Sequence, residues 1–334
     1  MKRLLLFFGA LLAGGALFGF LISGVGWDEA WDSLRAFSLL HALVVFLLTL
    51  GSLSVGALRW YFILKKQRCN IPFPDVWKAY LAGFSLWFFV PMFPFVNELF
   101  RASSLKEQYE VDLPKGMASV IIDRIFEITS NLFVVLVGGL IFLLMGDHIS
   151  YSAKMLAAIG FVGGWFLFLL LLYVRLFQKK SIVRLFWKNN GGMQEAEEEI
   201  FRFFQLKNPG FWQGICLSLG KSAVGIARAW VIILFFGKGF AVLPAITIHG
   251  FYYLAILVPI PAALGSHDIL QAIAFGAFGL GAGTGAAFAL VVRAVEVLFA
   301  VAGLALLFHF GLRFLKNLIF RKGNRLMKAF RHTR

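Results

Sequence analysis

Charged residues are scarce in this sequence: Asp, Glu, Lys and Arg make up 15% of 334 residues, whereas 60% are hydrophobic. A soluble domain carries about 25% charged residues, and no polar block here is long enough to form a separate soluble domain. Apolar runs recur along the whole chain, each close to the ~20 residues that cross a bilayer as a helix. The composition therefore predicts a single all-α, polytopic integral membrane domain over residues 1–334.

Cysteines and acidic residues are also few. The two cysteines, Cys69 and Cys216, have neither metal-binding nor redox spacing, and we interpret both as small apolar residues. Asp and Glu number 17 against 32 Lys and Arg, which gives a net charge of +15. Because the basic residues flank apolar runs, the positive-inside rule and anionic lipid headgroups explain them better than nucleic acid does. We therefore predict anionic membrane lipids as partners and no nucleic acid.

The common catalytic motifs are missing. The chain has no Gly-rich phosphate loop, no H-E-x-x-H zinc motif and no nucleophile elbow. Ser, His and Asp are adjacent in GSHD (265–268), and adjacency in sequence does not make a catalytic triad. We predict no metal and no cofactor, and nothing in the chain alone argues for an enzyme.

Nine apolar segments divide the chain, near 4–24, 39–58, 79–96, 116–146, 154–174, 211–236, 240–260, 268–283 and 286–310. The first follows a basic start, as in a signal peptide. Its apolar run is about 20 residues, longer than the ~7–15 residues of a signal peptide. We interpret it as an uncleaved first span.

The basic segments predict the topology. The positive-inside rule places 59–78 and 175–210 in the cytoplasm, and two long spans connect 97–115 to 175–210, so 97–115 is also cytoplasmic. Segment 79–96 then begins and ends on one side of the membrane. It contains VPMFP, whose two prolines break a helix. We predict a re-entrant hairpin at this segment.

A second proline segment, VPIPAALGSHD (258–268), predicts a second hairpin, which enters from the outside; two full crossings would satisfy the same topology. With two hairpins the chain has about six transmembrane helices. The chain then lies in the cell (inner) membrane with both termini in the cytoplasm, and 311–334 forms a basic cytoplasmic tail. In this topology the cytoplasmic segments hold 25 Lys and Arg and the outer segments hold three.

Sequence features recur at a nearly fixed offset. The matching pairs are 56–60 with 225–230, 90–94 with 258–261, and 124–127 with 293–296, at offsets of 169, 168 and 169 residues. Under the predicted topology, repeat units of about 39–146 and 211–310 have opposite orientations, which is the inverted-repeat arrangement of secondary transporters. An old duplication whose symmetry serves only packing is the alternative.

Charged residues inside apolar spans are the candidate site. Each costs ~2.5–3.5 kcal/mol at membrane depth even on insertion scales. Arg124 and Glu127, and likewise Arg293 and Glu296, are spaced to pair along one helix face. Such pairs either lock helices together or belong to a polar chamber in which arginine clamps an anionic headgroup.

Further candidates lie at the predicted hairpin ends and near tryptophans: Glu98, Arg101, Asp268, Arg59 and Arg228. Arg59 is open to a second interpretation as an interface anchor, because Trp favours the headgroup level. Arg228 and Lys221 lie deep in 211–236 and do not fit that interpretation.

Four motifs in order, PMFPFVNELFR, DRIFE, PIPAALGSHD and VVRAVE, resemble those of the lysylphosphatidylglycerol synthase transmembrane-domain family of flippase-like proteins. The resemblance covers nearly all of the chain and implies polar roles for Glu98, Arg101, Arg124, Asp268 and Arg293. Asn97 replaces an expected Gly, and Asp268 replaces an expected Glu, whose longer side chain would give a different ligand geometry. Some members carry a cytosolic aminoacyl-transferase domain, which has no counterpart in these residues. The resemblance thus implies lipid handling and does not imply lysyl transfer.

The leading hypothesis is a transporter or flippase that moves an anionic lipid, such as a phospholipid or a polyprenyl-phosphate carrier, between leaflets. An enzyme or accessory subunit acting on lipid-linked sugars is the first alternative, and a structural membrane partner is the second. The sequence leaves the oligomeric state open, and a homo-oligomer is one option.

Overall fold

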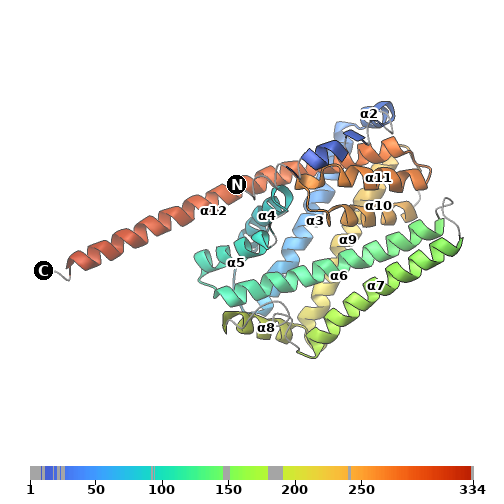
Figure 1. Ribbon diagram of the computed structural model, residues 1–334. Helices are drawn as coiled ribbons and strands as arrows, with labels where there is room; N and C mark the ends of the chain where they lie inside the picture. Colours follow the sequence, from blue (N-terminus) through green and yellow to red (C-terminus); the bar gives the residue numbers. More distant parts are fainter. Residues whose placement is uncertain are drawn as a thin grey trace.

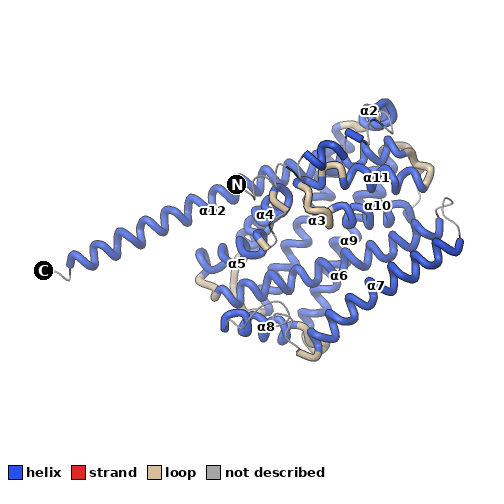
Figure 2. Tube along the Cα trace, in the orientation of Figure 1, coloured by secondary structure: helices blue, strands red, loops and turns tan. Residues whose placement is uncertain are grey.

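The protein is helical throughout the part that the computed structural model describes, which is residues 9, 12–17, 19–20, 23, 27–91, 93, 95–145, 151–179, 191–239 and 242–331. The elements are α2 (Trp27–Arg35), α3 (Leu39–Lys66), α4 (Phe73–Phe89), α5 (Val96–Tyr109), α6 (Leu113–Met145), α7 (Tyr151–Phe177), α8 (Gly191–Phe203), α9 (Pro209–Phe235), α10 (Val242–Ala255), the 3₁₀ turn η2 (Pro261–Ala263), α11 (Ser266–Ala277) and α12 (Ala282–Arg331). Figure 2 shows these helices joined by short loops. The predicted all-α class is confirmed for these residues, and most of the predicted first span, 4–24, lies outside them.

Four helices are long and apolar enough to cross a membrane: α3, α6, α9 and the part of α12 up to Phe310. They coincide with four of the predicted spans, and α7 is a further helix of 27 residues at the predicted span 154–174. A multi-pass membrane protein is therefore confirmed. The count of six crossings and the orientation of the termini stay predictions.

Both proline segments interrupt the helical backbone. Helix α4 ends at Phe89, two residues before Pro91, and α5 begins at Val96. In the second segment α10 ends at Ala255 and α11 begins at Ser266. Proline has no backbone N–H and clashes with the preceding turn, and the expected breaks are confirmed. Helix α5 covers most of 97–115, the segment that the predicted topology places in the cytoplasm.

The bundle is built on pairs of helices that pack closely (Figure 1). Helix α3 lies along α9, α4 packs on α12, and α10 packs on α6. Glycines permit two of these approaches. A Cβ at Gly303 of α12 would overlap the carbonyl oxygen of Leu81 in α4. A Cβ at Gly138 of α6 would lie 2.9 Å from the carbonyl oxygen of Ile246 in α10. Small residues at such crossings are typical of helices packed in membranes.

Helix α8 covers one end of the bundle. Its apolar side chains Ala196, Ile200 and Phe203 are buried in a cluster with Ile122 and Phe126 of α6. Helix α8 is thus a short amphipathic helix that packs on α6. Helix α12 continues without a break to Arg331. The predicted basic tail, 311–334, therefore begins as an extension of this helix.

Helix starts recur along the chain. Phe73 of α4 and Val242 of α10 lie 169 residues apart, and Leu113 of α6 and Ala282 of α12 have the same separation. Two pairs of helices thus begin at the offset that recurs in the sequence.

Candidate functional site

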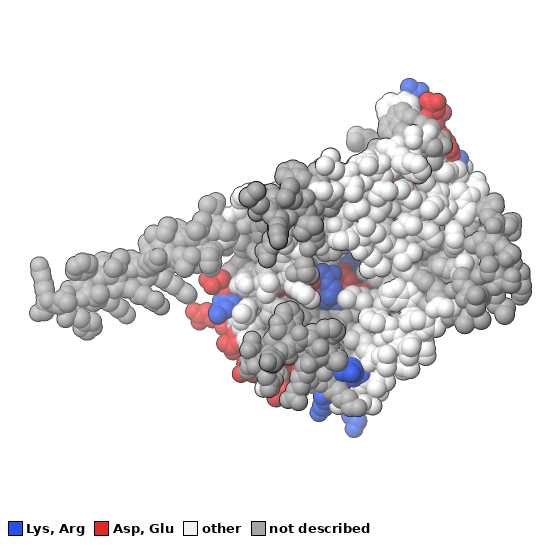
Figure 3. All heavy atoms as spheres, viewed as in Figure 1, with Lys and Arg blue, Asp and Glu red and all other residues white. Residues whose placement is uncertain are grey.

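A polar cavity of about 110 Å³ lies inside the bundle, between α3, α4, α5, α6, α9, α10 and α12. Figure 3 shows Lys, Arg, Asp and Glu atoms at the bottom of a hollow in a face that is otherwise mostly free of charged groups. The charged side chains that line the cavity are Arg101, Arg124, Lys221, Arg228, Glu127 and Glu296. Four positive groups thus face two negative ones in the lining of this cavity.

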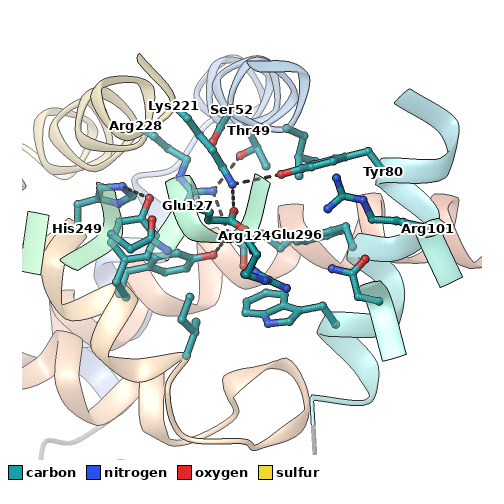
Figure 4. Close-up of a pocket in the computed structure, with 18 residues that line it drawn as sticks. Thr49, Ser52, Tyr80, Arg101, Arg124, Glu127, Lys221, Arg228, His249 and Glu296 are labelled. Atoms are coloured by element: carbon teal, nitrogen blue, oxygen red, sulfur yellow. Dashed lines mark hydrogen bonds and ion pairs between the residues drawn. The ribbon is translucent and has the colours of Figure 1, made fainter. Parts of the chain in front are cut away.

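Glu127 is the central acceptor of the cavity (Figure 4). Nη1 of Arg124 donates to its Oε2 at 2.8 Å, so the pair predicted from the i,i+3 spacing is present. The ammonium of Lys221 donates to its Oε1, and Nη2 of Arg59 lies 4.0 Å from the same oxygen. Lys221 also donates to the Tyr80 hydroxyl at 3.3 Å. Three cations from α3, α6 and α9 therefore converge on one carboxylate.

Two arginines, Arg59 and Arg101, share the carboxylate of Asp123, which is buried next to Glu127. Nε of Arg59 donates to one carboxylate oxygen at 2.6 Å, and Nη2 of Arg101 donates to the other at 2.8 Å. The Arg101 guanidinium also stacks 3.9 Å from the centre of the Trp60 ring, a favourable cation–π contact. Arg59 is 1% exposed, so the alternative that it is an interface anchor is wrong.

The helices that follow the proline segments are each tied to a long helix by an ion pair. Arg124 donates from Nε and Nη2 to Oε1 of Glu98 in α5, at 2.8 and 2.6 Å. Arg293 donates from Nη2 to Oδ2 of Asp268 in α11, at 2.6 Å. Each ion pair therefore links the helix that follows a proline segment to the long helix that carries the arginine.

The second predicted pair along one helix is wrong: Arg293 does not bond to Glu296. Arg293 turns to Asp268 and to the carbonyl oxygens of the η2 turn, at 3.2 and 3.4 Å. Glu296 instead accepts from Nη1 of Arg228 at 3.1 Å and from the Tyr252 hydroxyl at 2.9 Å. The i,i+3 spacing permits an ion pair between Arg293 and Glu296 within α12. Each of the two side chains instead bonds to residues outside α12.

Two glycines admit ring side chains to the cavity wall. A Cβ at Gly56 would overlap the Tyr80 hydroxyl, and a Cβ at Gly225 would overlap Nε2 of His249. His249 is buried, and its Nε2 lies 3.1 Å from the Tyr253 hydroxyl.

All nine predicted site residues line the cavity, bond to a residue next to it, or form the ion pairs that hold α5 and α11. Four residues that bind to the charged groups of the cavity were not among the predicted site residues: Asp123, Lys221, Tyr80 and Tyr252. Asp123 and Lys221 carried the signal used for the others, a charge inside an apolar span. The tyrosines carried none, because a tyrosine in an apolar helix is ordinary.

Three polar atoms of residues that line the cavity lack a hydrogen-bond partner among the described residues: Asn97 Oδ1, Asn131 Oδ1 and Arg101 Nε. Buried polar groups are normally bonded, so a ligand or water is the natural partner for them. Guanidinium groups match the planar, bidentate geometry of phosphate. The described residues contain no group of three or more His, Cys, Asp or Glu that could hold a metal ion.

Comparison with known proteins gives one family. The model of the family described as lysylphosphatidylglycerol synthase TM region matches residues 6–303. The comparisons with curated proteins and with solved structures found no match.

Proposed function

Because the chain belongs to the lysylphosphatidylglycerol synthase TM region family, we propose that it moves an anionic lipid between the leaflets of the cell membrane. Membership confirms the resemblance that the four sequence motifs carry. The observation that carries the proposal is the cavity lining, in which four cationic side chains face two carboxylates. When the ion-pair partners Arg59, Asp123 and Glu98 are included, the cations still outnumber the carboxylates by one. A phosphate group of a phospholipid or of a polyprenyl-phosphate carrier would balance this remaining positive charge.

The proposal includes an inverted repeat of two units, about 39–146 and 211–310. Helix starts that recur 169 residues apart support it. So do two pairs of contacts with the same offset: Arg59 bonds to Ser218 as Arg228 bonds to Thr49, at 3.0 and 3.2 Å. A polar cavity between such units is where secondary transporters hold their substrates.

In this proposal the two proline segments are re-entrant hairpins and act as gates. The ion pairs Arg124–Glu98 and Arg293–Asp268 hold the helix that follows each segment against α6 or α12. A lipid phosphate that takes over the guanidinium would release the hairpin on its own side. Both termini face the cytoplasm, and the chain crosses the membrane six times.

A vesicle assay tests the proposal. The purified full chain is reconstituted into lipid vesicles with an acyl-labelled fluorescent phosphatidylglycerol, and dithionite quenching reports the labelled lipid in the outer leaflet. We expect faster transbilayer movement than in protein-free vesicles, and a smaller effect on a zwitterionic phosphatidylcholine analogue. Equal rates with and without protein would contradict transport and favour an enzyme subunit or a structural partner.

Two variants separate headgroup binding from helix locking. Arg124→Lys keeps the charge but loses the planar fork, and we expect movement to slow by about tenfold, the effect of losing one charged hydrogen bond. Arg35→Lys in α2, an exposed arginine, is the matched control and should be unchanged.

The joint change Lys221→Met with Glu127→Gln tests the alternative. It leaves Arg124 with Glu98 and Arg59 with Asp123, so no charge is stranded. Near-normal rates in this variant would mean that the central charges are structural.

A further inference from the structure

A second polar pocket lies apart from the central cavity, at the end of the bundle where α3 ends and α6 and α9 begin. It has a volume of about 480 Å³. Its charged lining consists of Lys66, Arg68, Lys115, Arg202 and Glu199. Nothing in the proposed transport uses these residues. Four cations against one carboxylate nevertheless make this a place where an anion is favoured.

Gln67, the residue that ends α3, gives the pocket an unsatisfied hydrogen-bonding group. Its side chain lines the pocket and the residue is only 7% exposed. Neither Oε1 nor Nε2 has a partner among the described residues. Leaving such a buried amide unpaired costs about 1–3 kcal/mol, so the geometry implies that something outside the described residues bonds to it.

The backbone around the pocket also favours negative charge. The N-terminus of the 27-residue helix α9 faces it through the N-cap Asn208, and helix N-termini attract anions. Asn208 uses its side chain locally, since Oδ1 accepts from the Gly210 N–H at 2.9 Å and Nδ2 donates to Phe203 at 3.0 Å. The Lys66 stem lies over Gly210, where a Cβ would be 3.1 Å from Lys66 Cγ. Gly210 therefore allows Lys66 to lie across this helix end.

We propose that this pocket binds a phosphate group, carried either by a lipid headgroup or by a soluble phosphate ester. Lys66, Arg68 and Lys115 supply the charge, and the Gln67 amide donates a hydrogen bond to a phosphate oxygen. Arg202 is excluded from this set, because it pairs within α8 with Glu198 and Glu199 at 3.6 and 3.4 Å.

Two probes distinguish the sources of the phosphate. The full chain is placed in nanodiscs of zwitterionic lipid and titrated with pyrophosphate by calorimetry. In parallel, native mass spectrometry counts phosphatidic acid and phosphatidylcholine molecules retained by the purified protein. Pyrophosphate binding supports a soluble ligand, and selective retention of phosphatidic acid supports a headgroup.

Three variants assign the effect to the pocket. The joint change Lys66→Gln, Arg68→Gln and Lys115→Gln should weaken either signal by more than about tenfold, since each charged contact is worth about that factor. Gln67→Glu keeps the side-chain shape but places a carboxylate at the base, so it should abolish binding without disturbing the fold. Lys65→Gln removes an exposed charge of the same helix turn outside the pocket and should change binding less than about twofold.

The proposal is overturned if neither probe binds the unchanged protein. It is also overturned if the triple variant and Gln67→Glu bind as Lys65→Gln does. Because lipid translocation is measured separately, failure here leaves the transport proposal untouched.

Discussion

Arg59 and Arg228 each donate a hydrogen bond to a hydroxyl on the helix that carries the other arginine. Arg59 of α3 reaches Ser218 of α9 at 3.0 Å, and Arg228 of α9 reaches Thr49 of α3 at 3.2 Å. Both hydroxyls also donate to the carbonyl four residues earlier in their own helix. The reciprocal arrangement is that of a two-fold contact, in which each partner offers the same pair of groups.

The first prediction concerns these hydroxyls. Ser218→Ala and Thr49→Val should each lower the free energy of unfolding by about 1–3 kcal/mol, because a buried guanidinium N–H loses its acceptor. Unfolding in mixed micelles, followed by tryptophan fluorescence, measures the effect. Ser103→Ala, at an exposed serine of α5, is the control and should shift stability by less than about 0.5 kcal/mol. Equal effects at Ser218 and Ser103 would argue against the contact.

The second prediction tests the partners of Arg293. Double-mutant cycles combine Arg293→Gln with Asp268→Asn or with Glu296→Gln. We expect a coupling energy above about 1 kcal/mol with Asp268, which it contacts, and below about 0.5 kcal/mol with Glu296, which it does not. Stronger coupling to Glu296 would restore the pair along α12 that the spacing suggested.

The Arg293–Glu296 pair shows that spacing along a helix does not by itself predict which ion pair forms. The motif R-x-x-E occurs at 124–127 and at 293–296, yet only the first forms the pair within its helix. Spacing limits which groups can meet, and competition with partners from other helices decides which do. Asp268 and Arg228 lie 25 and 68 residues from the groups they bind, and no local pattern links them.

The helical class, the long apolar helices and the breaks at the prolines followed from the sequence, because each depends on local composition. The charged members of the cavity were also detectable, since a charge in an apolar span is costly and therefore rare. Tyr80 and Tyr252 were not, because their hydroxyls matter only through groups on other helices. Their contacts with Lys221 and Glu296 are tertiary.

A third prediction concerns helix packing. Gly303→Ala would place a Cβ on the carbonyl oxygen of Leu81, a backbone atom that cannot rotate away, so α12 must move from α4. Overpacking of this kind costs about 1–3 kcal/mol. Gly220→Ala is the matched control, since its Cβ would meet nothing within 4 Å, and it should stabilise by up to about 1 kcal/mol. Thermal unfolding of both variants in detergent measures the difference.

A fourth prediction concerns topology. In a background of Cys69→Ala and Cys216→Ala, Lys106→Cys should react with an impermeant maleimide only after the cells are permeabilised, because two spans connect its segment, 97–115, to the basic cytoplasmic segment 175–210. Lys154→Cys, at the predicted outer end of the span 154–174, should react in intact cells. Labelling of position 106 in intact cells would rule out the first hairpin.

The fifth prediction concerns Cys69, which lies after the end of α3. Burial raises the pKa of its thiol, so less thiolate is present at any given pH than for a free cysteine. Since the thiolate is the reactive form, Cys69 in a Cys216→Ala chain should react slowly with maleimide at neutral pH, and its rate should still rise above the pH where a free thiol levels off. Asn70→Cys, introduced after both native cysteines are replaced, is an exposed neighbour for comparison. Equal pH profiles at the two positions would contradict the raised pKa.

The ion pairs of α9 also impose an order on biosynthesis. Among the four long apolar helices α9 is the least apolar, and it carries both Lys221 and Arg228. The carboxylate for Lys221 is on α6, which the ribosome makes first, whereas the carboxylate for Arg228 is on α12, which is made last. A nascent α9 leaving the translocon can therefore neutralise one of its two cations at once, by joining α6. Until synthesis reaches Glu296, Arg228 has the Thr49 hydroxyl and the Tyr252 ring as partners but no carboxylate among the described residues. We therefore expect α9 to reach its final position in the membrane only after α12 has been translated.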